Sequence, residues 1–281
     1  MNKNKKSIVV TGGAGFIGSH LTTALLAEGY SVKVVDNVSG GKRENVPKEA
    51  VFFEQDINDT SALVKVMAGA EFVFHLAALP RVQYSIEHPV ESTKANVDGT
   101  VSVLKAAQDA GVKRVIYSAS SAAYGDQDIM PLTEDMQASP KSPYGLQKYI
   151  GELYCRLWSE TYGLPTVSLR YFNVYGPGAS AEGAYALVIA KFLEQRILGR
   201  PITITGDGTQ TRDFTHVRDV VRANILAAHS QKVGKGEVIN IGAGQNVSVA
   251  RVAELIGGPV EHIAPRLEPH DTLADNTRAR T

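Results

Sequence analysis

Short apolar runs alternate along the chain with longer stretches in which apolar positions recur with the period of a helix. The apolar runs at 7–11, 31–35, 51–53, 71–76, 114–118 and 166–171 are typical of strands buried on both faces. Helical periodicity lies between them, at 19–28, 89–110 and 144–162. Because strands that alternate with helices pair in parallel, the pattern predicts an α/β fold with a doubly wound parallel sheet.

The alternation weakens after residue 171. Helical patterns at 184–198 and 217–229 are interleaved with short strand patterns at 202–205 and 237–241, and Ser248 can cap a further helix. We therefore expect the main domain to span 1–172, with its sheet completed by about 215–245. A smaller C-terminal lobe, ending in a polar irregular tail, is expected from 173–214 and 246–281.

The composition narrows the class of protein. The 281 residues include 29 basic and 29 acidic side chains and no long basic run, so we expect no nucleic-acid partner. No segment has the pattern of a signal peptide or a membrane span. The single cysteine, Cys155, excludes an internal disulfide and a cysteine metal cluster, and we expect no metal. Together these features favour a soluble, cytoplasmic protein.

A glycine-rich turn follows the first predicted strand. It reads Gly12-Gly13-Ala14-Gly15-Phe16-Ile17-Gly18 and runs directly into a helix. In this context glycines let the backbone approach a pyrophosphate, and the helix N-terminus offers it amide groups and a partial positive charge. The stretch therefore predicts a dinucleotide-binding turn of the Rossmann type.

An acidic residue, Asp36, ends the second predicted strand. A carboxylate at this point can accept hydrogen bonds from both ribose hydroxyls of an adenosine and repels a 2′-phosphate. Asp36 therefore favours NAD over NADP, although Lys42 and Arg43 follow closely. The carboxyl ends of parallel strands meet at one edge of a sheet, so the glycine turn, Asp36, Asp56, Ala77 and Ser120 are expected there together.

Tyr144 and Lys148 lie four residues apart in a predicted helix that begins after Ser142-Pro143. This spacing places both side chains on one helix face. A neighbouring ammonium group favours the phenolate, so we expect Lys148 to lower the pKa of Tyr144 and make it a general base. Ser120 or Ser121 could hold the reacting oxygen. His75, inside an apolar strand, is expected to be a core residue.

The ordered set of motifs resembles the extended short-chain dehydrogenase/reductase family, and within it the UDP-glucose 4-epimerase type. The residues that carry the resemblance are Thr11-Gly12-Gly13-Ala14-Gly15-Phe16-Ile17-Gly18, Asp36-Asn37, His75-Leu76-Ala77-Ala78, Ser118-Ala119-Ser120-Ser121, Tyr124-Gly125, Tyr144 with Lys148, Arg170-Tyr171-Phe172-Asn173-Val174-Tyr175-Gly176-Pro177 and Arg212-Asp213-Phe214. The resemblance covers nearly the whole chain. It is highly specific for the family and less specific for the substrate.

The resemblance implies an isomerase of carbohydrate metabolism, an NAD-dependent 4-epimerase of UDP-sugars such as UDP-glucose, UDP-galactose and their N-acetyl counterparts. Tyr144, Lys148 and Ser120 are the implied catalytic residues, and Tyr144 takes the proton of the sugar 4-hydroxyl while NAD reversibly oxidises the sugar to a 4-keto intermediate. The implied NAD contacts are Gly12, Gly15, Phe16, Ile17, Gly18, Asp36, Asn37, Asp56, Ile57, Leu76, Ala77, Ala78, Asn96, Ser118, Tyr144, Lys148 and Tyr171. The implied substrate contacts are Ser120, Ser121, Tyr144, Asn173, Arg212, Arg266 and Thr272.

Several alternatives stay open within this resemblance. The 4,6-dehydratases carry an acidic pair where this chain has Ser121 and Ala122, which disfavours dehydration. A UDP-glucuronate 4-epimerase, another nucleotide-sugar-modifying relative, or a non-catalytic NAD-binding protein remains, although Tyr144, Lys148 and Ser120 together argue against the last. Relatives usually continue past the position of Thr281, so part of the lobe is expected to be missing.

Two further features follow from the resemblance. The small residue Thr272 leaves room for an acetamido group, which would admit N-acetyl hexosamines. The helices at 89–110 and 144–162 form the dimer interface in relatives, so we expect a homodimer.

Overall fold

The computed structural model describes residues 5–181, 187–264 and 270–281. Its centre is a seven-stranded sheet with the strand order β11-β6-β5-β4-β1-β2-β3, in which every neighbouring pair is parallel. The strands are β1 (Ser7–Thr11), β2 (Ser31–Asp36), β3 (Val51–Glu54), β4 (Ala70–His75), β5 (Arg114–Ser120), β6 (Thr166–Tyr171) and β11 (Glu237–Ile241). The predicted doubly wound α/β fold is confirmed.

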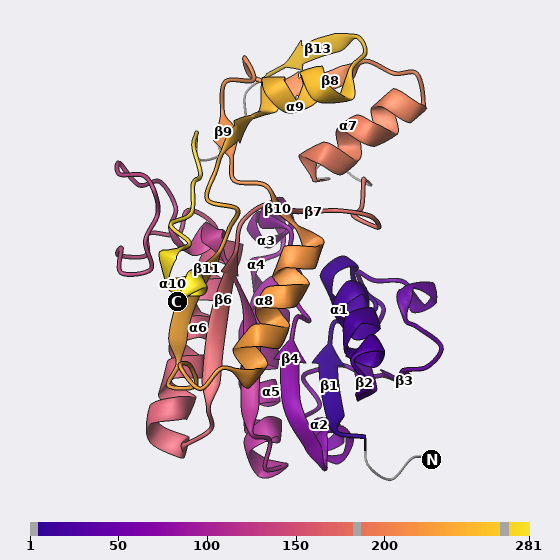
Figure 1. Ribbon diagram of the computed structural model, residues 1–281, viewed down its shortest axis with the longest axis vertical. Helices are drawn as coiled ribbons and strands as arrows, with labels where there is room; N and C mark the ends of the chain where they lie inside the picture. Colours follow the sequence, from indigo (N-terminus) through magenta and orange to yellow (C-terminus); the bar gives the residue numbers. More distant parts are fainter. Residues whose placement is uncertain (1–4, 182–186, 265–269) are drawn as a thin grey trace.

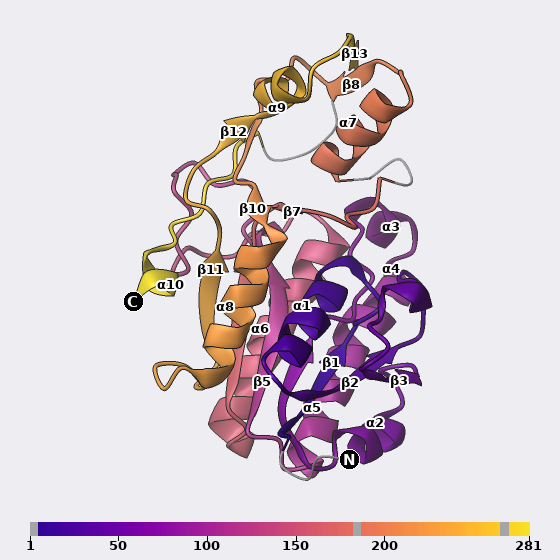
Figure 2. The same cartoon turned by 45° about the vertical axis from the view of Figure 1, so that its right-hand side comes forward.

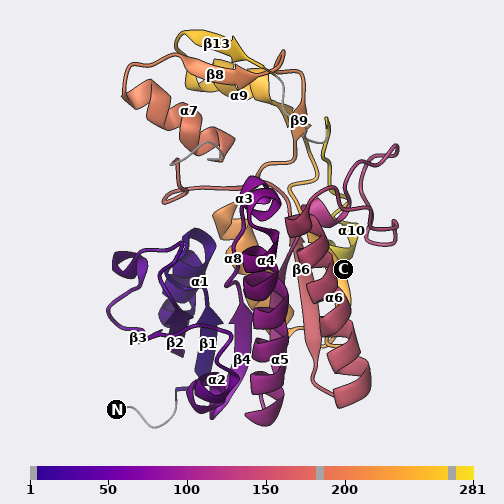
Figure 3. The same cartoon turned by 180° about the vertical axis from the view of Figure 1, so that it is seen from behind.

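Helices cover both faces of this main sheet. On one face lie α1 (Phe16–Ala27) and α8 (Val217–His229), and on the other lie α2 (Thr60–Met67), α5 (Gly99–Asp109) and α6 (Pro143–Tyr162) (Figures 1 and 3). Each layer buries its own apolar cluster, one including Leu21 and Val220, the other including Leu63 and Leu104. Burial on both sides explains why the strands are continuously apolar.

The prediction of one continuous helix at 89–110 is wrong in one respect, because the helix is interrupted. The structure has α4 (Pro89–Thr93), a π-helical turn (Lys94–Asp98) and then α5. Within the turn, Asn96 Oδ1 accepts a hydrogen bond from the main-chain N–H of Leu79 (2.7 Å), and Asn96 Nδ2 donates to the Leu79 carbonyl (3.1 Å). A side chain anchored outside the helix in this way favours the wider turn.

A smaller lobe lies beyond the edge at which the strands of the main sheet end (Figures 1 and 2). It contains α7 (Val188–Ile197), β8 (Ile202–Thr205), α9 (Val249–Ile256) and β13 (Val260–Ile263), and it buries its own cluster around Phe192, Ile202 and Val252. Parallel pairing of β8 with β13 joins its two chain segments. The helix expected at 184–198 is described only from residue 187 onward.

Two short sheets connect the small lobe to the main sheet. Strand β7 (Val174–Tyr175) pairs in parallel with β10 (Thr215–His216), and β9 (Thr211–Arg212) pairs antiparallel with β12 (Val247–Ser248). The expected cap at Ser248 is confirmed, since its hydroxyl accepts a hydrogen bond from Arg251 N at 3.1 Å. The remaining short elements are η1 (Arg43–Asn45), α3 (Val82–Glu87), η3 (Ser121–Ala123) and α10 (Thr277–Arg280).

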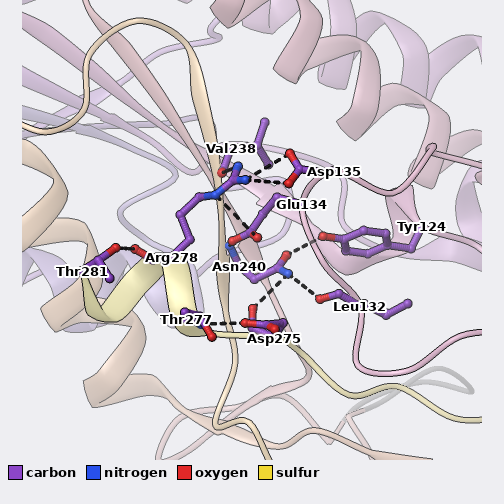
Figure 4. Close-up of polar contacts among 10 residues, drawn as sticks. All are labelled: Tyr124, Leu132, Glu134, Asp135, Val238, Asn240, Asp275, Thr277, Arg278 and Thr281. Carbon is purple, nitrogen blue, oxygen red and sulfur yellow. Dashed lines mark hydrogen bonds and ion pairs between the residues drawn. The ribbon is translucent and has the colours of Figure 1, made fainter.

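The C-terminal tail returns to the main sheet instead of staying in the small lobe. Leu132 N donates to the Leu273 carbonyl (2.7 Å), and Asp275 N donates to the Leu132 carbonyl (2.9 Å). Figure 4 shows Asn240 of β11 at the centre of the contact: its amide group donates to the carbonyls of Leu132 and Asp275 and accepts from the Tyr124 hydroxyl. The tail that the sequence marks as irregular is therefore tied down by specific hydrogen bonds.

In the part of the chain that the structure describes, no helix is both long and apolar enough to cross a bilayer.

Candidate active site

The glycine turn packs so closely against neighbouring main chain that Gly12 and Gly18 leave no room for side chains. A Cβ on Gly12 would lie 2.6 Å from Ala77 N, and one on Gly18 would lie 2.2 Å from the Gly12 carbonyl. A Cβ on Gly15 would meet only the Gly12 carbonyl, at 3.2 Å. Gly15 is the N-cap of α1, which begins at Phe16. Packing therefore requires glycine at positions 12 and 18, whereas Gly15 places a residue without a side chain directly before a helix N-terminus, which fits a pyrophosphate.

Asp36 lies where β2 ends and is held by the main chain. Its Oδ2 accepts from Ala14 N (2.9 Å) and its Oδ1 from Val38 N (2.8 Å), so each oxygen still has a lone pair for another donor. Val38 has a φ of 56°, an unfavourable value for a β-branched residue. The strained backbone keeps the carboxylate next to the glycine turn, where a ribose can reach both oxygens.

The next acidic residue, Asp56, belongs to the same neighbourhood. It accepts from the Asn37 side chain (3.3 Å) and from the main chain and side chain of Asn58. The main-chain hydrogen bond from Asn58 is the largest cause of the lowered pKa of Asp56, so it is charged at neutral pH. Ile57 is buried beside Gly99. Asn37 and Asp56 together extend the polar rim beyond Asp36.

The segment after β4 lies against the glycine turn. Leu76 N donates to the Thr11 carbonyl (3.1 Å), and Ala77 N donates to the Thr11 hydroxyl (3.3 Å). His75 is enclosed behind this segment between the hydroxyls of Thr11 (2.8 Å) and Thr100 (3.1 Å). Burial lowers the pKa of His75 to about 3, so it is neutral. The prediction that His75 is a core residue is confirmed.

Helix α6 presents Tyr144 and Lys148 to the end of β5. The helix begins at Pro143, and the Ser142 hydroxyl caps it by accepting from Gly145 N at 3.1 Å. Lys148 Nζ donates to the Ser118 carbonyl (2.8 Å), and Tyr144 lies near enough to Ser120 for the serine side chain to act on its pKa. The three implied catalytic side chains are thus brought together at the edge of the sheet.

Residues on the small-lobe side of the edge form a second group. Asn173, which has a φ of 30°, donates from Nδ2 to the Asp213 carbonyl (3.3 Å) and to the Thr272 hydroxyl (3.2 Å). Arg212 Nη1 donates to the carbonyls of Thr211 and His270, both at 2.9 Å. Asn173, Arg212 and Thr272 therefore lie close together. Ser121 lies in the turn after β5, and Arg266 lies outside the described residues.

Two residues implied as NAD contacts, Asn96 and Tyr171, have side chains that form hydrogen bonds within the protein. Asn96 is 1% exposed and directs its amide donors to the Leu79 carbonyl and to Gln147 Oε1 (2.8 Å). The Tyr171 hydroxyl donates to Asn224 Oδ1 (3.0 Å) in the core beneath α8. Their side chains position the segment after β4 and helix α8 rather than reaching the edge. The remaining implied contacts, Phe16, Ile17 and Ala78, lie in the first turn of α1 and after β4.

Comparison with known proteins agrees with this geometry. The model of the NAD dependent epimerase/dehydratase family matches residues 8–242. The chain belongs to this family. The membership confirms NAD as the cofactor, and the glycine at the N-cap of α1 and the carboxylate of Asp36 suit it.

Relatives are similar over almost their full length. The putative UDP-glucose 4-epimerase of Methanocaldococcus jannaschii is 38% identical over 251 residues, which are 89% of this chain and 81% of that protein. The structure of UDP-N-acetylglucosamine 4-epimerase from Methanobrevibacter ruminantium M1 in complex with UDP-N-acetylmuramic acid has a TM-score of 0.94 at 38% identity, covering 98% of this chain and 91% of that one. UDP-glucose 4-epimerase from Thermotoga maritima with UDP-glucose has a TM-score of 0.92 at 40% identity, with the same coverage.

The electrostatics of the family's Tyr-Lys pair differ from the sequence-based expectation. Burial raises the pKa of Tyr144, and the hydrogen bond with Ser120 acts in the opposite direction without overcoming it. The pKa of Tyr144 in this structure is therefore shifted upward, whereas the sequence predicted a lowering by Lys148. The ammonium group is directed to the Ser118 carbonyl and lies 5.0 Å from the centre of the Tyr117 ring. The Tyr144 hydroxyl therefore has to lose its proton before the residue can act as a base.

A buried ion pair, which the sequence analysis missed, lies behind Lys148. Arg170 of β6 donates from Nε (2.9 Å) and Nη2 (2.7 Å) to the carboxylate of Glu152, and both side chains are almost fully buried. Glu152 is four residues after Lys148 on the same helix face, and its charge acts to raise the pKa of Lys148. The repeated spacing of four residues is the signal that could have revealed it.

Lys148 gives the site a pH-dependent contribution to stability. Burial lowers its pKa from 10.5 to about 8. Between these pH values the unfolded chain binds more protons than the folded chain, so the stability of the wild type rises with pH. We expect the unfolding free energy of the wild type to increase relative to that of Lys148→Met between pH 7 and pH 10, by up to about 3 kcal/mol. Urea unfolding at both pH values measures this difference.

The exposed Lys105 provides the matched control, since Lys105→Met removes a lysine without removing a buried charge. A difference between wild type and Lys148→Met that stays constant from pH 7 to pH 10 would contradict the buried-charge interpretation.

Proposed function

We propose that this protein is an NAD-dependent 4-epimerase of UDP-sugars. The observation that carries the proposal is the placement of Tyr144, Ser120 and Lys148 at the end of the main sheet, with the glycine turn on the same edge. A non-catalytic dinucleotide-binding protein has no need of a half-buried tyrosine at this place. The relatives named as UDP-glucose and UDP-N-acetylglucosamine 4-epimerases support the same reaction.

In the proposed reaction the chain's own residues handle the proton of the sugar 4-hydroxyl. Ser120 forms a hydrogen bond with that hydroxyl, and Tyr144 in its phenolate form takes the hydroxyl proton and later returns it. Bound NAD supplies reversible oxidation at the same carbon. Because Lys148 is largely protonated at pH 7, its positive charge favours the phenolate form of Tyr144 that accepts the proton.

The substrate is proposed to lie between the two lobes. The main domain, 1–172 with 215–245, would hold the dinucleotide, and the lobe formed by 173–214 and 246–281 would hold the nucleotide sugar. Arg212 suits a diphosphate because its guanidinium offers a fork of donors. Ser121 and Ala122 occupy the positions of the acidic pair of dehydratases, which favours epimerisation over dehydration.

The proposed reaction predicts inversion at carbon 4 of a UDP-sugar with purified protein. We expect inversion of UDP-galactose or UDP-glucose, followed by proton NMR, without net consumption of NAD, because the sugar is oxidised and reduced in turn. Net NADH formation instead would indicate a dehydrogenase or an oxidative decarboxylase. Inversion of UDP-glucuronate alone would indicate a uronate epimerase.

The variant Tyr144→Phe serves as the control for this experiment, since it removes only the ionisable hydroxyl. It should retain NAD, measured by absorbance after denaturation, and lose about two to four orders of magnitude in turnover. Unchanged turnover would overturn the assigned role of Tyr144.

The size of residue 272 is proposed to decide whether an N-acetyl group is accepted. Thr272 is small and its hydroxyl is held by Asn173 Nδ2 (3.2 Å), so its side chain is turned toward Asn173. We expect comparable kcat/KM for UDP-glucose and UDP-N-acetylglucosamine. Thr272→Tyr should lower kcat/KM for the N-acetyl sugar by at least about tenfold and change kcat/KM for UDP-glucose much less. The larger side chain would occupy the space of the acetamido group, which UDP-glucose lacks. Wild-type activity on UDP-glucose alone would contradict this assignment.

We infer a homodimer formed through α5 and α6. Leu146, Leu153 and Leu157 form an apolar stripe on the exposed face of α6, each between 38% and 47% exposed, whereas Leu104 of α5 packs inward. Light scattering after gel filtration should give twice the mass of 30.2 kDa. Leu153→Glu combined with Leu157→Glu should give the monomer mass, because charges on the stripe would lose hydration on association. A monomeric wild type would overturn the inference.

A further inference from the structure

Asp213 lies between the two short sheets that connect the lobes, and its side chain is fully buried. Its Oδ1 accepts from Ala243 N (2.7 Å), and its Oδ2 accepts from Gly244 N (3.0 Å) and Ala274 N (3.1 Å). The donors come from the loop after β11 and from the C-terminal tail. One carboxylate therefore joins three segments that are far apart in the sequence.

The main chain of Asp213 extends this junction to the side chains implied in substrate binding. Its carbonyl accepts from Asn173 Nδ2 (3.3 Å), and its N–H donates to the Thr272 hydroxyl (3.4 Å). Arg212 is its neighbour in the chain. The residue thus touches or adjoins Asn173, Arg212 and Thr272, which come from three different segments.

The surroundings of the Asp213 side chain fit a carboxylate of this size and leave little room for a larger group. A Cβ on Gly242 would lie 2.8 Å from Asp213 Oδ2, so the glycine makes room for the charged group. Burial raises the pKa of Asp213, whereas the N–H groups of Ala274, Ala243 and Gly244 act in the opposite direction. An acceptor-only group satisfies all these donors, whereas an amide would turn N–H toward N–H.

We propose that Asp213 is a positioning residue for the nucleotide sugar, whose carboxylate sets the relative placement of Asn173, Arg212 and Thr272. The inference rests on the proposed function, since it assigns those three side chains to the same ligand. Asp213 itself does not contact the ligand. It acts by joining the loop after β11 and the C-terminal tail to the strand that carries Arg212, so the diphosphate meets a site that is already assembled.

The variant Asp213→Asn tests this inference because it keeps the shape of the side chain and replaces one acceptor oxygen with a donor. In a calorimetric titration, we expect UDP to bind the variant at least about tenfold more weakly than the wild type. The variant loses charge-assisted hydrogen bonds that hold the binding site together. KM for the UDP-sugar should rise by a similar factor while kcat changes less than about threefold, since Tyr144 and Ser120 lie on the main sheet. NAD content should be unchanged.

A matched control separates positioning from general loosening of the fold. Thr166→Val removes a buried hydroxyl of β6 that donates to the Cys155 carbonyl at 2.7 Å, far from the three segments. It should lower Tm and leave UDP affinity unchanged. Equal loss of UDP affinity in this variant, or unchanged affinity in Asp213→Asn, would overturn the inference.

A double-mutant cycle with Arg212→Ala shows whether Asp213 acts through its neighbour. The combined loss of UDP affinity should be well below the product of the two single losses, and a fully multiplicative loss would contradict positioning. The outcome is distinct from failure of the proposed function. A wild type that binds UDP but inverts no sugar refutes the epimerase assignment and still tests Asp213, whereas a wild type that binds no UDP overturns both.

Discussion

The close approach of α6 to β5 is the constraint on which the geometry of the candidate active site depends. A Cβ on Gly151 would lie 2.2 Å from the Tyr117 hydroxyl, so only glycine permits the observed separation of helix and strand. One turn earlier on the helix, the same approach brings Lys148 within hydrogen-bond distance of the Ser118 carbonyl. A second turn earlier, it places Tyr144 beside Ser120. Packing of one residue without a side chain thus sets the position of the reactive groups.

Burial at this contact has an electrostatic cost that the neighbouring residues partly offset. Lys148 is 4% exposed, and an ammonium group in such surroundings loses much of its hydration. Glu152 supplies a nearby negative charge, and Arg170 in turn is held by both oxygens of Glu152 and lies 4.4 Å from the centre of the Tyr124 ring. The charges of Lys148, Glu152 and Arg170 therefore alternate in sign. This arrangement keeps the cation Lys148 on the same helix face as Tyr144, and the carboxylate of Glu152 is compensated by Arg170.

Local pattern was sufficient to predict the parts of the fold that depend on local interactions. The apolar strands, the glycine turn, the acid at the end of β2 and the helix start at Ser142-Pro143 each have a signature within a few residues. The π-helical turn at Asn96 has none, because it depends on contacts with Leu79 and Gln147 from other elements. The raised pKa of Tyr144 and the inward hydroxyl of Tyr171 depend on burial, which only the assembled fold determines. The three main-chain N–H groups that donate to Asp213 likewise come together only in the assembled fold.

The two halves of the candidate site have different mechanical supports, and this matters for the proposed reaction. A sugar that is reduced on its second face has to turn between oxidation and reduction, while its nucleotide stays anchored. Tyr144 and Ser120 rest on the main sheet and α6, whereas Asn173, Arg212 and Thr272 rest on the junction around Asp213. Strong contacts in the second group can hold a nucleotide without fixing the sugar, because none of them comes from the element that carries Tyr144. Separate supports therefore allow tight anchoring and free rotation in one site.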